Sequence, residues 1–182
     1  MMQPSEAILY GLSRITFGLS IFFDRNDDIA FTNIDGADVL IEKFHFVEDE
    51  KWIDLKITPC YKEKSFDVEI TFPYVIKEDK LDDAFILVNQ MNSTGTPCAT
   101  SIDLIHRKIQ IKTYVTFTGF HDDEDNDSVD YSHCQDEVTL NFFASIFGQA
   151  ESWWRWIELV AESDTTAVNL INQRNKFYSR SA

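Results

Sequence analysis

The spacing of apolar residues changes twice between residues 66 and 119, and this change constrains the fold more than any other feature. From Phe66 to Phe72, apolar and polar residues alternate, the pattern of a strand with one buried face. Pro73 ends that strand, because proline has no backbone N–H to donate to a sheet. After Pro73 the apolar residues recur at a different spacing.

A helix is predicted over residues 81–91. Its apolar residues recur at helical spacing and form one stripe, made of Leu81, Ala84, Phe85, Val88 and Met91. Acidic residues from Glu78 to Asp83 lie at the N-terminal end, where the helix dipole favours negative charge. The polar segment from Asn92 to Pro97 is expected to end the helix.

Two alternating runs between Cys98 and Phe117, closing at residues 118–119, predict a hairpin. The first strand is expected to run through Leu104 and Ile105. The chain then turns at His106-Arg107-Lys108.

The remaining pattern places further strands at 15–23, 29–34, 38–47 and 52–58, and a short helix near the N-terminus. A long helix is expected from about residue 137 to 162. Its buried stripe comprises Phe143, Ile146, Phe147, Ala150, Trp154, Ile157 and Ala161. These elements predict an α+β fold with an antiparallel sheet and helices packed on one side. Residues 1–182 are expected to form a single domain, with an acidic loop at 121–136 and a C-terminal tail at 164–182 that contains a short helix.

The chain of 182 residues carries a formal net charge of −15. Such a charge disfavours binding to nucleic acids, whose phosphates require clustered Lys and Arg, and to anionic membranes. It either serves solubility or offers an acidic surface to a basic partner.

The three cysteines, Cys60, Cys98 and Cys134, are far apart, odd in number and without a CxxC pair. Neither a disulfide framework nor a zinc knuckle is indicated, so we expect a cytoplasmic protein. The longest apolar run, from Ile15 to Phe23, is too short to span a bilayer.

No pattern indicates catalysis, a cofactor or a metal. The sequence contains neither GxSxG nor a phosphate-binding glycine loop. An EF-hand reading from Asp122 fails, because Asp127 and His133 occupy the positions of the required Gly and Glu. His121, His133 and Cys134 lack the spacing of a metal motif, so a solvated loop is expected there.

The aromatic cluster Trp153-Trp154-Arg155-Trp156 is the main candidate for function. If Trp154 faces the core, Trp156 lies almost opposite, on the side of Ser145, Gln149 and Ser152. Either the tail or a broader core covers this helix, or the indoles form a protein interface, where Trp and Arg are enriched. On the second interpretation, the predicted partner-binding residues are Trp156 and Trp153. Phe22, on the Thr16-Gly18-Ser20 face of the first strand, is a weaker candidate.

The order of elements resembles the YbjN-like family and the fold that it shares with type III secretion chaperones. The similar parts are the strand Phe66–Phe72, the helix Leu81–Met91, the paired strands after it, and the helix from Leu140 to Trp154. The resemblance implies a dimeric or partner-binding protein without a catalytic centre. The extra strands between residues 15 and 64, the acidic loop and the tail depart from that pattern.

The sequence therefore favours a non-catalytic cytoplasmic protein, chaperone-like or regulatory, that binds a polypeptide. A basic partner and a homodimer are both compatible with this prediction. The alternatives are an acidic immunity or antitoxin-type inhibitor of a basic toxin, and an enzyme whose site has no recognisable motif.

Overall fold

The computed structural model describes residues 23–25, 30–34, 37–46, 52–60, 65–116 and 137–179. The first predicted helix, most of the first strand and the acidic loop 121–136 lie outside these residues. The chain divides into two compact units, Met1–Glu69 with Thr113–Ala144, and Ile70–Lys112 with Ser145–Ala182. The expected single domain stays a prediction.

The first unit contains antiparallel strands arranged around β3 (Ala37–Phe46). Two short strands, β1 (Phe23–Arg25) and β2 (Ala30–Ile34), pair with different parts of β3, and β4 (Ile53–Cys60) also pairs with it. In the β3–β4 ladder Leu40 lies opposite Ile57 and Phe44 opposite Ile53. The strand β5 (Ser65–Thr71) follows β4 in the strand order.

The predicted alternation in β4 and β5 is confirmed. In β4 the buried side chains are Ile53, Leu55 and Ile57, whereas Asp54 and Lys56 are half-buried. Because side chains in a strand point alternately to opposite faces, one face of each strand supplies the core.

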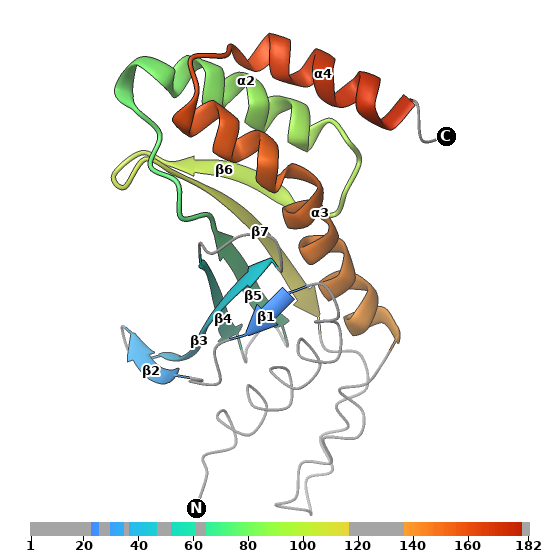
Figure 1. Ribbon diagram of the computed structural model, residues 1–182. Coiled ribbons are helices and arrows are strands. Elements are labelled where there is room, and N and C mark those ends of the chain that lie inside the picture. Colours follow the sequence, from blue (N-terminus) through green and yellow to red (C-terminus); the bar gives the residue numbers. More distant parts are fainter. Residues whose placement is uncertain are drawn as a thin grey trace, which may run out of the picture. The chain divides into compact units, whose positions relative to one another are not determined.

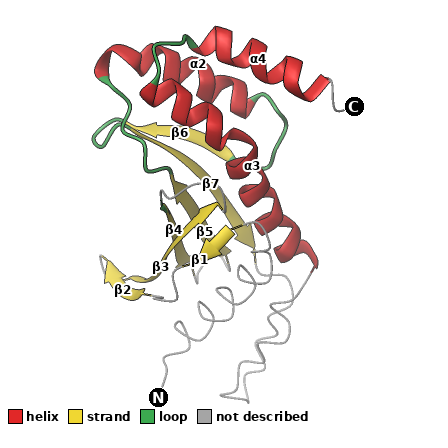
Figure 2. Ribbon diagram, viewed as in Figure 1, coloured by secondary structure: helices red, strands yellow, loops and turns green. Residues whose placement is uncertain are grey.

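The second unit combines a hairpin with three helices, although the end of the second hairpin strand and the start of the longest helix lie in the first unit. The hairpin strands are β6 (Ala99–Asp103) and β7 (Lys108–Thr116), paired from Ala99 with Lys112 to Asp103 with Lys108. The helices are α2 (Leu81–Asn92), α3 (Glu137–Glu162) and α4 (Ala167–Ser179), and a short 3-10 turn, η3 (Glu78–Lys80), precedes α2. Helix α2 contacts both β6 and α4, and within this unit the helices gather on one side of the hairpin (Figures 1 and 2). The α+β prediction is therefore confirmed.

Two details differ from the sequence-based expectation. The turn of the hairpin comprises residues 104–107, so Leu104 and Ile105 are turn residues and not part of the first strand. In α2 the buried stripe is Ala84, Leu87, Val88 and Met91, and Phe85 is exposed. The stripe is rotated because α2 packs against both β6 and α4, a tertiary arrangement that periodicity alone does not define.

The predicted stripe of α3 is confirmed over its described side chains. Ile146, Phe147, Ala150, Trp154, Ile157 and Ala161 are all buried. The rings of Phe72 and Tyr74 lie 5.8 and 5.2 Å from Trp154, measured between ring centroids. These tilted and edge-on contacts are the geometries that aromatic pairs prefer, so Trp154 is a core residue.

Candidate protein-binding site

The end of α3 and the helix α4 bring Trp153, Arg174 and Tyr178 together. The guanidinium carbon of Arg174 lies 3.7 Å from the centroid of the Trp153 ring and 4.7 Å from that of Tyr178. A cation at these distances from two aromatic faces is attracted by both rings, by roughly 0.5–2 kcal/mol for each contact. We call these three residues the Trp–Arg–Tyr stack.

Burial of Arg174 has an electrostatic cost. Its Nε atom is buried and has no hydrogen-bond partner in the structure. Burial lowers the pKa of the guanidinium, an effect partly opposed by Tyr178. The two aromatic faces therefore provide the main compensation for removing part of this cation from water.

The residues predicted to bind a partner differ in how exposed they are in the structure. Trp153 is only 1% exposed, beneath Arg174, so the tail covers this part of α3 as the alternative interpretation expected. Trp156 is half-buried, one helical turn further along the same side of α3 as Trp153. Phe22 lies outside the described residues. A role for these residues in partner binding stays a prediction.

The side of α3 that carries Gln149, which the sequence pattern places opposite the core, is partly buried. Gln149 is buried, and its amide nitrogen donates to Thr100 Oγ1 at 3.1 Å, while Thr96 Oγ1 donates to its carbonyl oxygen at 2.7 Å. Asn92 completes this network by bonding both the N–H and the C=O of Thr100. Polar residues on this side therefore pack against β6, because their hydrogen-bonding groups find partners there.

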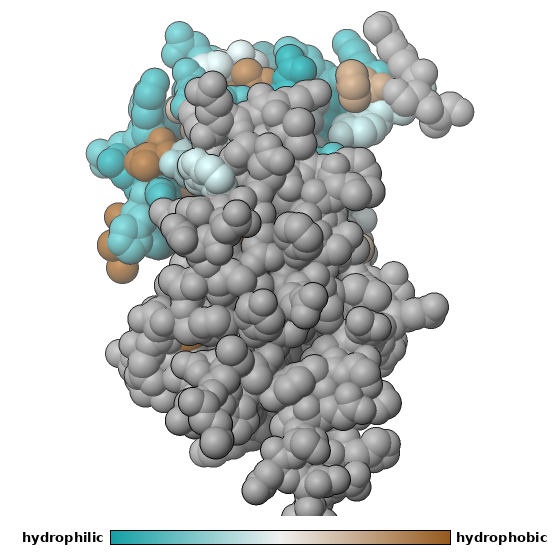
Figure 3. All heavy atoms as spheres, turned by 60° about the horizontal axis from the view of Figure 1, so that its bottom comes forward, coloured by the Kyte–Doolittle hydropathy of each residue, from teal (hydrophilic) through white to brown (hydrophobic). Residues whose placement is uncertain are grey.

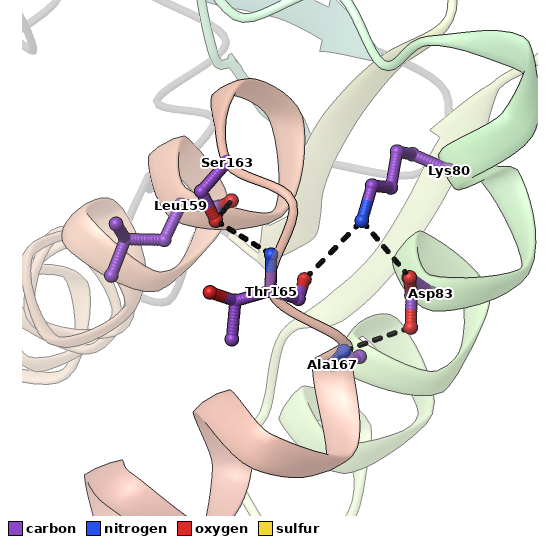
Figure 4. A network of polar contacts seen from close by, with 6 residues as sticks. All are labelled: Lys80, Asp83, Leu159, Ser163, Thr165 and Ala167. Carbon is purple, nitrogen blue, oxygen red and sulfur yellow. Dashed lines mark hydrogen bonds and ion pairs between the residues drawn. The ribbon is translucent and has the colours of Figure 1, made fainter.

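The start of α4 is fixed by residues of η3 and α2 (Figure 4). Asp83 Oδ1 accepts a hydrogen bond from the backbone N–H of Ala167 at 2.8 Å, which satisfies one free donor of the first helical turn. Lys80 Nζ lies 3.6 Å from Asp83 Oδ2 and donates to the carbonyl of Thr165 at 3.4 Å.

The connection before α4 has its own hydrogen bonds, also drawn in Figure 4. Ser163 Oγ donates to the carbonyl of Leu159 at 2.6 Å and accepts from the N–H of Thr165 at 3.2 Å. Together with Asp83 and Lys80, these bonds define the direction in which α4 leaves α3. This direction brings Arg174 over Trp153.

The fully buried side chains of α4 belong to its first turns. Ala167 and Leu170 are buried, whereas Tyr178 is exposed. Figure 3 shows hydrophobic groups in small clusters between hydrophilic ones on the described part of the face in view. Near the end of α4, Phe177 and Tyr178 are both exposed.

The residues that the structure describes show neither a metal centre nor a membrane-spanning helix. These residues contain no group of three or more His, Cys, Asp and Glu side chains placed to hold a metal ion. No helix among them is long and apolar enough to cross a bilayer.

Comparisons with known proteins give one solved structure. No family model and no curated protein matches the chain. The structure, the crystal structure of the ExsC–ExsE complex, aligns with a TM-score of 0.49 and 12% sequence identity, over 86% of this chain and 97% of that chain. A likeness this weak says nothing of a shared function.

Sequence reasoning missed Arg174 and Tyr178, although both are visible in the sequence. They are four residues apart, a spacing that places side chains on one face of a helix. Their connection with Trp153 depends on how α4 packs, which no sequence pattern indicates.

Proposed function

We propose that the protein is a non-catalytic cytoplasmic binding protein, chaperone-like or regulatory, that takes a polypeptide partner at the end of α3 and on α4. The observation that carries this proposal is the Trp–Arg–Tyr stack. Trp, Tyr and Arg are the residues that dominate binding energy in protein interfaces. The stack holds Arg174 over the ring of Trp153, and Trp156 is half-buried one helical turn further along α3.

In this proposal Trp156 and Tyr178 contact the partner directly. Trp153 supports the surface from beneath Arg174, and it contacts the partner only when α4 moves. Phe22 is a second, separate contact. The net charge of −15 favours a basic partner, because complementary charge accelerates encounter and excludes acidic competitors.

The test is affinity capture from the cell of origin with three forms of the protein. Trp156→Ala and Tyr178→Ala are expected to weaken capture at least roughly 30-fold if either residue is a hot spot. Tyr114→Ala is the matched control, because Tyr114 is an exposed aromatic residue of a different element, β7. The proposal is wrong if all three variants capture the same partner as the wild type with unchanged affinity.

A further inference from the structure

The guanidinium group of Arg174 has two aromatic neighbours but no anionic one among the described residues. Its carbon atom lies 3.7 Å from the centroid of the Trp153 ring and 4.7 Å from that of Tyr178. None of the described residues forms a hydrogen bond or an ion pair with it, and its Nε atom is buried. Because the removal of a charge from water is unfavourable, a partly buried cation is normally paired with an anion. The unpaired state of Arg174 therefore needs an explanation.

The composition of the chain makes this unpaired state unusual. Asp and Glu together number 31, against 16 Lys and Arg, so carboxylates are abundant. Lys80, in the same unit, shows the ordinary arrangement, with its Nζ atom 3.6 Å from a carboxylate oxygen of Asp83. At Arg174, burial lowers the pKa of the guanidinium, and Tyr178 is the described residue that opposes this effect.

The position of Arg174 near the end of α4 does not explain its burial. The dipole of a helix favours cations at its C-terminal end. Lys176, two residues later, obtains the same benefit while it is exposed to water. The attraction of the guanidinium to two rings, roughly 0.5–2 kcal/mol for each, offsets part of the unfavourable burial. It does not satisfy the N–H groups.

These N–H groups are suited to one class of ligand. A guanidinium carries five N–H donors that lie in its plane, whereas contacts with aromatic rings use its flat face. Two parallel N–H groups match the two oxygens of a carboxylate and form a bidentate pair with it. The side chain of Arg174 as a whole is half-buried, so it is not closed to solvent. Because the stack already orients the group, little entropy is lost when a ligand binds.

The end of the chain is positively charged, unlike the rest. From residue 165 onwards the sequence contains Arg174, Lys176 and Arg180, and neither Asp nor Glu. Charges further away than about 10 Å are largely screened at ordinary salt concentrations. The nearby cations of α4 therefore influence an anion bound to Arg174 more than distant acidic residues do.

We propose that Arg174 is a carboxylate receptor, and that it pairs with a carboxylate of the polypeptide bound at the end of α3 and on α4. Trp153 and Tyr178 hold the guanidinium while its N–H groups donate to both carboxylate oxygens. The carboxylate belongs to an Asp or Glu side chain or to the C-terminus of the partner, and a basic polypeptide offers either. This inference rests on the proposed function, which places a polypeptide at this site.

A phosphate group has similar oxygens but more negative charge. A chain with a net charge of −15 repels it more strongly than it repels a carboxylate. The proposal therefore assigns Arg174 to a carboxylate.

Three small molecules with one skeleton test the receptor without a partner. N-acetylglutamic acid α-amide has only a side-chain carboxylate, N-acetylglutamine has only a terminal carboxylate, and N-acetylglutamine amide has neither. Each is titrated into the full chain while the Nε–H signal of Arg174 is followed by NMR. We expect a saturable shift with at least one of the two carboxylates and none with the amide.

Two substitutions separate the shape of the guanidinium from its charge. Arg174→Lys keeps the charge and the attraction to the rings but loses the planar pair of donors, so the Kd of the carboxylate should rise at least about fivefold. Arg174→Gln also removes the charge and should raise the Kd at least about tenfold. Backbone amide shifts of residues 171–179 report binding in these variants, and circular dichroism checks that they are folded.

Lys176→Gln is the matched control. It removes one positive charge from the same helix but leaves the Trp–Arg–Tyr stack intact. Because Lys176 is exposed and acts through water, the Kd should stay within about twofold of that of the wild type.

The probe that binds identifies the source of the carboxylate. Binding of the α-amide alone assigns the receptor to an Asp or Glu side chain, and binding of N-acetylglutamine alone assigns it to a C-terminus. Binding of both shows that the receptor accepts either. Each of these results supports the proposal.

Three outcomes overturn the proposal. The first is that neither carboxylate binds to the wild type. The second is that a carboxylate binds equally well to folded Arg174→Gln. The third is that inorganic phosphate, titrated in the same way, binds more tightly than both carboxylates, because this would assign Arg174 to a phosphoryl group.

The receptor and the proposed function fail in different experiments. The titration contains no partner, so its failure leaves the capture by the Trp156 and Tyr178 variants as a separate test. If a carboxylate binds at Arg174 but those variants capture the partner with unchanged affinity, the proposed function is wrong and the receptor serves another carboxylate ligand.

Discussion

Single residues in the second unit show how polar groups are placed in a mostly apolar core. Gln149 is the best example, because it is buried on a long helix and still makes hydrogen bonds with both its amide nitrogen and its carbonyl oxygen. A buried polar group that keeps its partners costs little, whereas its removal leaves the partners unsatisfied.

Gln149→Met is therefore expected to lower the free energy of unfolding by about 1–3 kcal/mol, because the buried Thr100 loses a hydrogen-bond partner. Denaturant unfolding measures this change. Gln173→Met makes the same substitution on the exposed side of α4, where an effect within about 0.5 kcal/mol is expected. Equal effects at both positions would contradict the proposed importance of the network.

The turn of the hairpin is expected to respond to acid. The hydrogen bond from His106, and then those from the backbone, hold the pKa of Asp103 below its ordinary value of 3.8. A depressed pKa means that the carboxylate stabilises the folded turn fully above the ordinary value and loses this effect as the pH falls through the depressed one.

Amide exchange by NMR measures the consequence. Protection of the Ile105 and His106 N–H groups should hold at neutral pH and fall below a pH of about 4. The side chain in Asp103→Asn keeps an accepting oxygen but does not titrate. The protection of the Ile105 and His106 N–H groups should therefore not change over this pH range. If protection in the wild type is equally independent of pH, Asp103 does not hold the turn.

At the scale of elements, α4 depends on a residue of another helix for its start. Asp83 accepts the N–H of Ala167, as an N-cap side chain does, although it belongs to α2. The cap therefore contributes to the packing of two elements as well as to the stability of one helix.

Asp83→Ala is expected to lower the free energy of unfolding by about 1 kcal/mol, and to loosen α4 so that Trp153 becomes accessible to water. A fluorescence quencher detects this exposure. Glu78→Ala, in which the removed carboxylate is exposed in the turn before α2, is the matched control. Unchanged quenching in Asp83→Ala would show that Arg174 and the core hold α4 without the cap.

Periodicity predicts β4, β5 and α3 well, because the described side chains of each form one clearly buried face. The alternation in β4 and β5 and the stripe of α3 follow from strand and helix geometry alone. Periodicity places Phe85 on the wrong face, because the orientation of α2 depends on α4, an element distant in sequence. It extends the first hairpin strand through Leu104 and Ile105, because apolar residues are rarely expected in a turn.

At the scale of the whole molecule, the candidate site was only partly predictable. The sequence indicates that the indoles of residues 153–156 cannot share one narrow stripe, but it does not indicate that Arg174 covers Trp153. That contact depends on tertiary packing between α3 and α4. The net negative charge follows from the amino-acid composition and is therefore predictable from the sequence alone.

The central claim is that a polypeptide binds at the end of α3 and on α4. Hydrogen–deuterium exchange of the protein, alone and with the captured partner, tests it most directly. The account predicts that the partner increases protection in peptides covering residues 152–160 and 171–179. Protection confined to other peptides, or no change at all, would contradict it.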